Sequence, residues 1–341
     1  MFTYILTKRY ITFVMLAVFI VFYCHFSTAQ ETVDEASVEI ISLSGDVNIL
    51  SPVTNTWTGA ITGLRLISGN RIRTSDNSHV NLAFNPQKNN IVSVRANSHV
   101  VLQLKGADKL TLIDGTLFSS IQELVDGSSF EIKTPLATCG VCGTKYTLSY
   151  YANTKLTTLA VMESSVVLES ITEPDKFVSV KELEERELAP WDNIYLDATG
   201  VGFSTDMPAE GKIEEISEKD YMGIYTPDGL IHARRTAETD AYRNLAARIY
   251  GTVIDSKTVL GDYAKKNNEV KVTVSGLVRG AQEMGIAYFS DGSVRITMEI
   301  RGLQLKDSLS PLTGDIFDKT CITGADRLTQ KDLKYFDEAL L

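Results

Sequence analysis

Short alternating segments dominate residues 38–180 of this 341-residue chain. Apolar and polar residues alternate in "HVNLAF" (79–84), "HVVLQLK" (99–105) and "KYTLSYY" (145–151), and Gly, Asn, Asp, Ser or Pro separates the segments. A period of two places every second side chain on one face of a strand. Strands that recur about every ten residues predict an all-β sandwich, barrel or solenoid. We expect no helix in this half.

One motif occurs twice. "NSHVNL" (77–82) recurs as "NSHVVL" (97–102), an offset of 20 residues. A fixed period of this length is typical of one coil or hairpin pair in a stacked β architecture. If the two copies stack directly, His79 and His99 lie roughly 5 Å apart and could bind a metal or sense pH. As exposed turn residues they would do neither.

The chain changes character after "KELEERELAP" (181–190), a charged stretch that predicts a linker or a short helix. A strand with a Gly-x-Gly follows at 193–204; its third glycine is missing, so it is not a dinucleotide motif. Between 227 and 250 an apolar residue recurs every four positions, which predicts an amphipathic helix ended by Gly251. These positions are Ala233, Ala237, Ala241, Leu245 and Ile249. The three alanines would let the helix lie close to a sheet.

Three further β segments are expected after this helix. They are "TVIDSKTVL" (252–260), "EVKVTVSGLVRGA" (269–281) and the hairpin "IAYFSDGSVRITMEIRG" (286–302), whose "SDGS" is a turn signal. The order β-α-β-β-β predicts an α+β layer over 191–303. The remainder, 304–341, is expected to be a polar tail.

The N-terminus has the three parts of a secretory signal peptide. Lys8 and Arg9 precede an uncharged stretch at 10–26, and small residues follow it. We therefore predict a signal peptide over 1–29, cleaved between Ala29 and Gln30. The apolar stretch is slightly short for a membrane span; if it stayed uncleaved, it would be the chain's contact with the membrane.

Composition and motifs exclude several classes of function. The formal charge of −10 argues against nucleic acid as the partner. The sequence contains no Gly-x-Ser-x-Gly, no His-Glu-x-x-His and no phosphate loop with lysine. We therefore assign no catalytic, cofactor-binding or metal-binding residue and expect a protein that is not an enzyme.

Cys139 and Cys142 form a CxxC within "LATCGVCGTKYTL" (136–148). A catalytic pair needs a helix N-terminus to lower the thiolate pKa, whereas a strand pattern follows here. Three interpretations stay open: buried reduced thiols, a local disulfide in an oxidising compartment, and redox or metal chemistry. Gly140 and Gly143 indicate a bulge or corner in a sheet.

With these residues laid out, the N-terminal half resembles a FecR domain. The matching stretches are 45–50, 56–84, 91–103, 113–121, 129–148 and 157–170. The family usually has Gly-Val-Arg-Gly-Thr after "TP", so Cys142 stands where the family has arginine. FecR regulators of the anti-sigma type place a cytoplasmic domain before their membrane span. Only about nine residues precede the apolar stretch here, so we do not expect transcription signalling.

The C-terminal half resembles the FlgP-like envelope lipoprotein family. "ATGVGF" (198–203), 233–258, "VSGLVRGA" (274–281) and "DGSVRITMEIRG" (291–302) carry this resemblance. It implies an exported bacterial protein of the outer membrane or of flagellar accessory structures, with a structural role.

We therefore expect two domains, a FecR-like β-sandwich or solenoid over 38–180 and an α+β domain over 191–303. The expected function is a binding or assembly module of the periplasm or outer membrane, and a motility or envelope accessory factor. Its partners would be envelope proteins or copies of itself, paired through strand edges. The alternative is binding of cell-wall glycan or polysaccharide, with an exposed aromatic such as Trp57 stacking on sugars; a buried Trp57 would remove that support.

Overall fold

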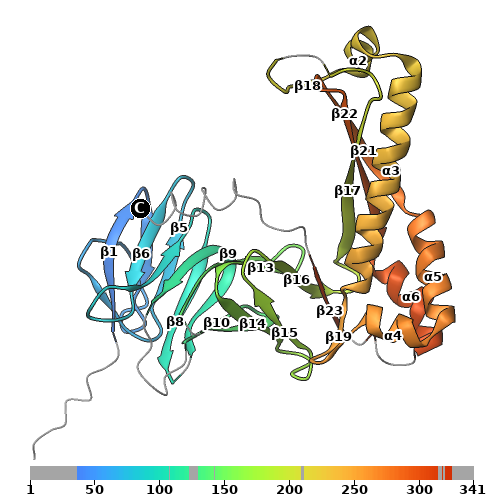
Figure 1. The fold of residues 1–341 in the computed structure, drawn as a ribbon. Coiled ribbons are helices and arrows are strands. Elements are labelled where there is room, and N and C mark those ends of the chain that lie inside the picture. Colours follow the sequence, from blue (N-terminus) through green and yellow to red (C-terminus); the bar gives the residue numbers. More distant parts are fainter. Residues whose placement is uncertain are drawn as a thin grey trace, which may run out of the picture. The chain divides into compact units, whose positions relative to one another are not determined.

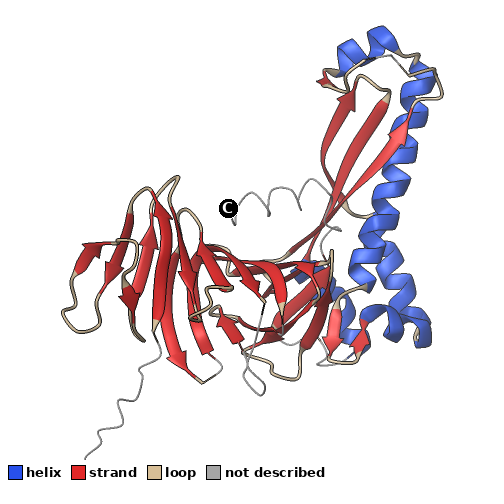
Figure 2. Ribbon diagram, turned by 60° about the vertical axis from the view of Figure 1, so that its left-hand side comes forward, coloured by secondary structure: helices blue, strands red, loops and turns tan. Residues whose placement is uncertain are grey.

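The computed structural model describes residues 37–106, 108–122, 130–141, 143–208, 211–313, 317 and 319–324. The chain divides into two units, Met1–Ala36 and Ser37–Leu341, and all described residues belong to the second. The predicted signal peptide and its cleavage site at Ala29 and Gln30 lie outside the described residues. The expected fold class, mainly β with a C-terminal region of mixed helices and strands, is confirmed. Figure 2 shows the helices gathered in the C-terminal region.

Two sheets, named A and B, share one hydrophobic core (Figure 1). Sheet A consists, in spatial order, of β4 (Arg65–Leu66), β1 (Val38–Ser44), β6 (His79–Ala83), β7 (Asn90–Val94), β9 (Asp108–Ile121), β12 (Thr144–Tyr151), β13 (Leu156–Glu163), β16 (Glu185–Pro190), β23 (Thr320–Gly324), β19 (Val253–Asp255) and β20 (Thr258–Val259). Sheet B consists of β3 (Trp57–Gly59), β2 (Val47–Leu50), β5 (Arg71–Thr74), β8 (His99–Lys105), β9, β10 (Phe130–Lys133), β11 (Ala137–Val141), β14 (Ser165–Ser170) and β15 (Phe177–Lys181). Alternate side chains of both sheets point into the shared core, as the period of two predicts.

The chain passes between the two sheets at corners, and each corner within the described residues contains a residue with positive φ. These residues are Gly45, Gly63, Gly69, Asn77, Asn97, Gly115, Gly143, Ser164 and Leu183. At Gly115, with φ +100°, β9 itself crosses from sheet B to sheet A. Glycine and asparagine are the residues that enter this backbone region at least cost. Glycine or asparagine therefore occupies most of the corners at which the chain changes sheet.

The repeated motif forms two equivalent corners. Asn77 and Asn97 have φ +53° and +55°. Ser78 Oγ accepts a hydrogen bond from the N–H of Asp46 (2.9 Å), and Ser98 Oγ accepts one from the N–H of Thr116 (3.0 Å). Each serine side chain occupies the space where a Cβ of the facing glycine, at 45 or 115, would lie. The repeat is therefore a serine–glycine packing motif at the corners.

The expected stacking of His79 on His99 is wrong. His79 lies on β6 in sheet A, opposite Ser44, whereas His99 lies on β8 in sheet B, opposite Arg73. One copy of the motif leads from sheet B to sheet A and the next leads back, so the two histidines are carried to different sheets. Burial lowers the pKa of His99, with Arg73 and Arg71 adding to the effect.

The C-terminal region contains a four-stranded antiparallel sheet, sheet C, with helices on one face (Figure 1). Its strands are, in spatial order, β17 (Tyr195–Phe203), β22 (Ser293–Arg301), β21 (Gln282–Phe289) and β18 (Glu215–Ile216). The helices are α2 (Glu218–Ile224), α3 (Pro227–Tyr250), α4 (Leu260–Lys266), α5 (Asn268–Arg279) and α6 (Gly302–Thr313). The predicted helix and hairpin are confirmed as α3, with Gly251 as its C-cap, and as β21–β22. In the described part of the chain no helix is both long and apolar enough to cross a membrane.

The expected strand at 269–281 is wrong, because this segment is α5. Valines at 270, 272 and 274 alternate as in a strand, but the buried valines are 270, 274 and 278, which lie four residues apart. Asn267 caps the helix by accepting hydrogen bonds from the N–H groups of Glu269 and Val270. The packing of one helical face against α3, α4 and α6 therefore prevails over the local preference of β-branched residues.

Two stretches expected to be loose are part of the core structure. Glu185–Pro190, within the expected linker, forms β16 between β13 and β23, with Leu188 fully buried. Within the expected polar tail, α6 buries Leu305 and Leu309 completely, and β23 adds a strand to sheet A. Charged side chains mask the strand pattern in 185–190, and these charges are paired in the fold, for example Glu187 with Arg248.

Candidate functional site

Helix α3 lies directly on β17, because both contribute small residues to the contact. Gly200 and Gly202 on the strand face Ala233, Ala237 and Ala241 on the helix, and all three alanines are fully buried. A Cβ at Gly200 would lie 2.0 Å from Ala237 O. The Gly-x-Gly therefore serves close helix–sheet packing, as the alanine spacing predicts.

A row of polar side chains on α3 covers the outer edge of β17. Asp240 accepts a hydrogen bond from the N–H of Val201 (3.0 Å), and Asn244 donates one to Thr199 O (2.9 Å). Arg248 donates to Asp197 O (2.9 Å). Asp240, Asn244 and Arg248 are four residues apart on the helix, and Val201, Thr199 and Asp197 are two residues apart on the strand. Each helical residue therefore lies beside its own partner along this edge. The backbone of this edge strand is thereby closed to pairing with another strand.

Arg248 also connects sheet C to sheet A. Its guanidinium forms ion pairs with Glu187 on β16 and with Asp197 on β17, the latter at 2.7 Å. Its side chain is only 9% exposed, so this cation is largely removed from solvent. Removal of either carboxylate would leave a buried charge less well compensated.

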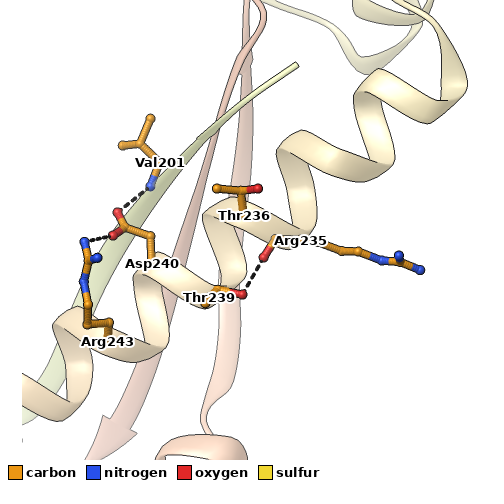
Figure 3. A pocket seen from close by; sticks show the side chains of 6 residues that line it. All are labelled: Val201, Arg235, Thr236, Thr239, Asp240 and Arg243. Carbon is orange, nitrogen blue, oxygen red and sulfur yellow. Dashed lines mark hydrogen bonds and ion pairs between the residues drawn. The ribbon is translucent and has the colours of Figure 1, made fainter. Parts of the chain in front are cut away.

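A pocket of about 380 Å³ lies where α3 meets the outer edge of β17 (Figure 3). Its lining consists of Val201, Arg235, Thr236, Thr239, Asp240 and Arg243. The Asp240 carboxylate already accepts a hydrogen bond from the Val201 N–H and forms an ion pair with Arg243. Thr239 Oγ1 donates a hydrogen bond to Arg235 O (2.8 Å). Arg235 points away from the others in Figure 3. The pocket contains no nucleophile paired with a base, so its chemistry is that of polar binding.

The face of sheet C opposite α3 carries exposed aromatic and arginine side chains. Tyr195 is 47% exposed and Phe203 is 57% exposed, at the two ends of β17. Arg301 lies opposite Tyr195 in the strand register, and the Arg295 guanidinium stacks 4.3 Å above the Phe289 ring. Aromatic residues and arginine are enriched at protein interfaces. We call this set of residues on β17, β22 and β21 the open face.

Cys139 lies on β11, close to the corner formed at Gly143. Cys139 is a fully buried free thiol on β11, and burial raises its pKa well above the ordinary value. Gly143, with φ +68°, turns the chain from sheet B to sheet A. Cys142 lies outside the described residues, so a disulfide between Cys139 and Cys142 stays a prediction. Among the described residues no group of three or more His, Cys, Asp or Glu side chains is placed to hold a metal.

Trp57 is 39% exposed on the edge strand β3 and does not belong to the core. The Arg73 guanidinium stacks 4.6 Å from its ring centroid, so one face of the indole is already in contact with a cation.

The open face was not anticipated from the sequence. The signal available was the alternation of Tyr195, Val201 and Phe203 with the small residues that face α3.

The comparisons with known proteins give one family model and a set of solved structures. The FecR protein family model matches residues 70–167. Two crystal structures of a proposed anti-sigma factor from Parabacteroides distasonis ATCC 8503, at 1.65 Å and 2.50 Å resolution, are each 16% identical with a TM-score of 0.30. The match covers 35% of this chain and 54% of that one, so it spans about half the length of that protein. No curated protein matches the chain.

The family match leaves residues 168–341 uncovered, so the resemblance of the C-terminal region to FlgP-like proteins stays a prediction. The FecR family is non-enzymatic, in agreement with the expectation that this protein is not an enzyme. Within the sandwich, the residues from β5 to β14 are those that the family model describes. Residues 70–167 of this chain are a FecR domain.

Proposed function

We propose that this chain is an exported assembly module of the bacterial envelope that associates with a second copy of itself through the open face of sheet C. The observation that carries the proposal is the exposure of Tyr195 and Phe203 on a face that no helix covers among the described elements. The edge of β17 is closed by α3, so strand addition there is not the route. Export rests on the signal-peptide pattern of the first 29 residues.

The register of β17 and β22 makes the open face self-complementary. Its rows are Tyr195–Arg301, Asp197–Glu299, Thr199–Thr297, Val201–Arg295 and Phe203–Ser293. The two threonine hydroxyls of the central row hydrogen-bond to each other at 2.9 Å. Asp197 and Glu299 form the row next to this central row on one side, and Arg295 lies in the row next to it on the other side. A face with this arrangement can meet its own copy with opposite charges in contact.

The two-fold axis of such a dimer lies between the two facing copies of sheet C. It runs across the strands along the Thr199–Thr297 row. Rotation about it places Glu299 of each copy over Arg295 of the other, twice per dimer. The same rotation places Tyr195 over Phe203, so an aromatic contact closes each end. Two sheets packed in this way lie about 10 Å apart with side chains interdigitated.

Sedimentation velocity on the mature chain at increasing concentration tests this arrangement. We expect a monomer–dimer equilibrium, and Arg295→Glu should weaken it at least about tenfold because Glu299 then meets a like charge. The double variant R295E/E299R should restore association. Arg301→Glu is the matched control, because the axis places it over Ser293. A protein that stays monomeric throughout, or an R295E variant that dimerises normally, would refute the self-association.

Export is tested separately by cell fractionation and N-terminal sequencing. We expect the protein in the envelope or periplasmic fraction with Gln30 as its first residue. Recovery in the cytosol with an intact N-terminus would contradict export. Capture of envelope proteins by a chain that remains monomeric would indicate a different partner for the open face.

A further inference from the structure

Strand β3 forms a free edge of sheet B. All three of its residues are exposed, and among the described strands it pairs with β2 alone. Two further apolar side chains are exposed next to it, Val53 in the turn that precedes β3 and Ile61 just after it. An edge strand presents unpaired N–H and C=O groups that can pair with a strand from another chain. This edge therefore offers both backbone groups and apolar surface to a partner.

The hydrogen-bond pattern shows which backbone groups of β3 face away from β2. Hydrogen bonds on the β2 side are formed by Thr56 O (3.2 Å), just before β3, and by Ala60 N–H (2.8 Å), just after it. Bonded and non-bonded residues alternate along an antiparallel ladder, so Thr58 bonds to β2, whereas the N–H and C=O groups of Trp57 and Gly59 point to the free side. No described residue forms a hydrogen bond with these groups. A Cβ at Gly59 would meet nothing within 4 Å, so the surface beside Trp57 is open.

Two arginines without a carboxylate partner lie beside this edge. Arg71 and Arg73 are exposed on β5, the next strand after β2, and the residue between them, Ile72, is fully buried in the core. Both arginines therefore project from the face of sheet B that lies away from the core. Neither forms an ion pair with a described residue. The Arg73 guanidinium extends to the Trp57 ring on β3, 4.6 Å from its centroid, so a cation lies at the edge itself.

The nearby carboxylates are already engaged by uncharged donors. The Asp46 carboxylate, just before β2, accepts hydrogen bonds from the side chains of Asn48 and Ser75, each at 2.8 Å. Asp76, which follows β5, accepts one from the Asn97 side chain, also at 2.8 Å. These hydrogen bonds leave the two arginines uncompensated in a chain whose formal charge is −10. An unpaired cationic surface on an acidic protein favours an acidic partner.

His99 on β8 responds to the same positive charge. It lies opposite Arg73 in the strand register. Burial lowers the pKa of His99, Arg73 and Arg71 lower it further, and Asp114 opposes them. The Asp114 carboxylate in turn accepts a hydrogen bond from the N–H of Ala152 (3.0 Å). Of the charges that act on His99, those of the two arginines therefore outweigh that of Asp114.

We propose that an acidic, extended segment of a partner protein adds to β3 as a further strand of sheet B. Its backbone pairs with the outward groups of Trp57 and Gly59, and its carboxylates meet the positive charge of Arg73 and Arg71. Neighbouring strands lie about 4.8 Å apart, and the Arg73 guanidinium already lies over β3, so a carboxylate on the added strand is within its reach. Main-chain hydrogen bonds provide the affinity of such complexes, and alternate side chains provide their specificity. The site shares no residue with the open face, so it does not depend on self-association.

Binding of a labelled peptide to the mature chain tests the preference for an acidic partner. The probe is a fluorescein-labelled peptide of about eight residues in which valine and glutamate alternate, as an added strand requires. Its binding is measured by fluorescence anisotropy. We expect saturable binding, and a peptide with lysine in place of glutamate should bind at least about tenfold more weakly. If the acidic peptide does not bind, or if both peptides bind equally well, the proposal is wrong.

Two variants at one position test the addition of a strand. Gly59→Pro removes an outward N–H and leaves the bonds between β3 and β2 in place, so it should weaken binding of the acidic peptide at least about tenfold. Gly59→Ala is the matched control, because it keeps the N–H and its Cβ meets nothing within 4 Å. It should bind the peptide as the parent chain does. If G59P binds as tightly as G59A, no strand is added and the proposal is wrong, even where the acidic peptide is preferred.

The double variant R71A/R73A tests the role of the arginines. Both side chains are exposed, so we expect urea unfolding to stay unchanged while binding of the acidic peptide weakens at least about tenfold. Unchanged binding would contradict the proposal. A photo-crosslinking residue at the centre of the peptide then locates the site, and we expect crosslinks to fragments within residues 46–61. Crosslinks to β15, at the other end of sheet B, or to sheet C would overturn the proposal.

Discussion

Replacing Gly200 by alanine tests whether small residues alone allow α3 to lie on β17. A Cβ at Gly200 would lie 2.0 Å from Ala237 O and 2.1 Å from Ala241 N. Ordinary contact begins at 3.4 Å, so the helix backbone must retreat by about 1.4 Å to admit the methyl group. Neither contact atom is the end of a flexible side chain, so no rotamer change relieves the clash.

The retreat would also break the row of hydrogen bonds along β17. The bonds from Val201 N–H to Asp240 and from Asn244 to Thr199 O measure 3.0 Å and 2.9 Å. Lengthened by about 1.4 Å, neither meets the geometry of a hydrogen bond. Each bond contributes about 0.5–1.5 kcal/mol, and the overpacking itself costs about 1–3 kcal/mol. We therefore expect G200A to lower the free energy of unfolding by about 3 kcal/mol or more.

Urea unfolding followed by tryptophan fluorescence measures this loss, because Trp191 is buried in the C-terminal core. Gly285→Ala is the matched control. Gly285 lies on β21 of the same sheet, and a Cβ there meets nothing within 4 Å. Its unfolding free energy should change by less than about 1 kcal/mol. If G200A and G285A unfold at the same urea concentration, the close-packing argument fails.

Three further predictions concern the β17 edge, the contact of Glu173 with Thr320 on β23, and the thiols. The variant D240A/N244A uncovers the β17 edge and should increase concentration-dependent aggregation, measured by light scattering; unchanged scattering would argue against edge protection. Burial acts to raise the pKa of Glu173, but hydrogen bonds from Thr320 and Lys176 outweigh it and leave the pKa lowered. Glu173 therefore stabilises the fold above its unfolded pKa, and this contribution is lost as pH falls from about 4.5 through the lower folded pKa. Glu173→Gln should flatten the acid limb of stability against pH, and an unchanged limb would contradict the assignment. Burial raises the pKa of Cys139 and Cys321, so neither thiol should react with a thiol reagent in the native state. Both should react in denaturant. A total of one reactive thiol in unreduced, denatured mature protein would instead indicate a Cys139–Cys142 bridge.

The sequence predicted the features that depend on local periodicity. Alternating segments indicated the strands of the sandwich, and four-residue spacing indicated α3 with its alanine face. The turn signal "SDGS" indicated the β21–β22 hairpin. The glycines around Cys139 and Cys142 indicated a corner, and Gly143 takes the positive φ of one. These features could be predicted because a side chain's direction within a strand or helix is set by the residues next to it.

Only the tertiary structure decided which sheet each strand joins and what each face meets. His79 and His99 have the same local sequence, yet the corners carry them to different sheets. The alternating valines of α5 suit a strand, and its packing against other helices makes it a helix. The rows of the open face exist only because β17 and β22, which are distant in the sequence, pair with each other. Local periodicity assigns a side chain to a face, but long-range register assigns that face its neighbours.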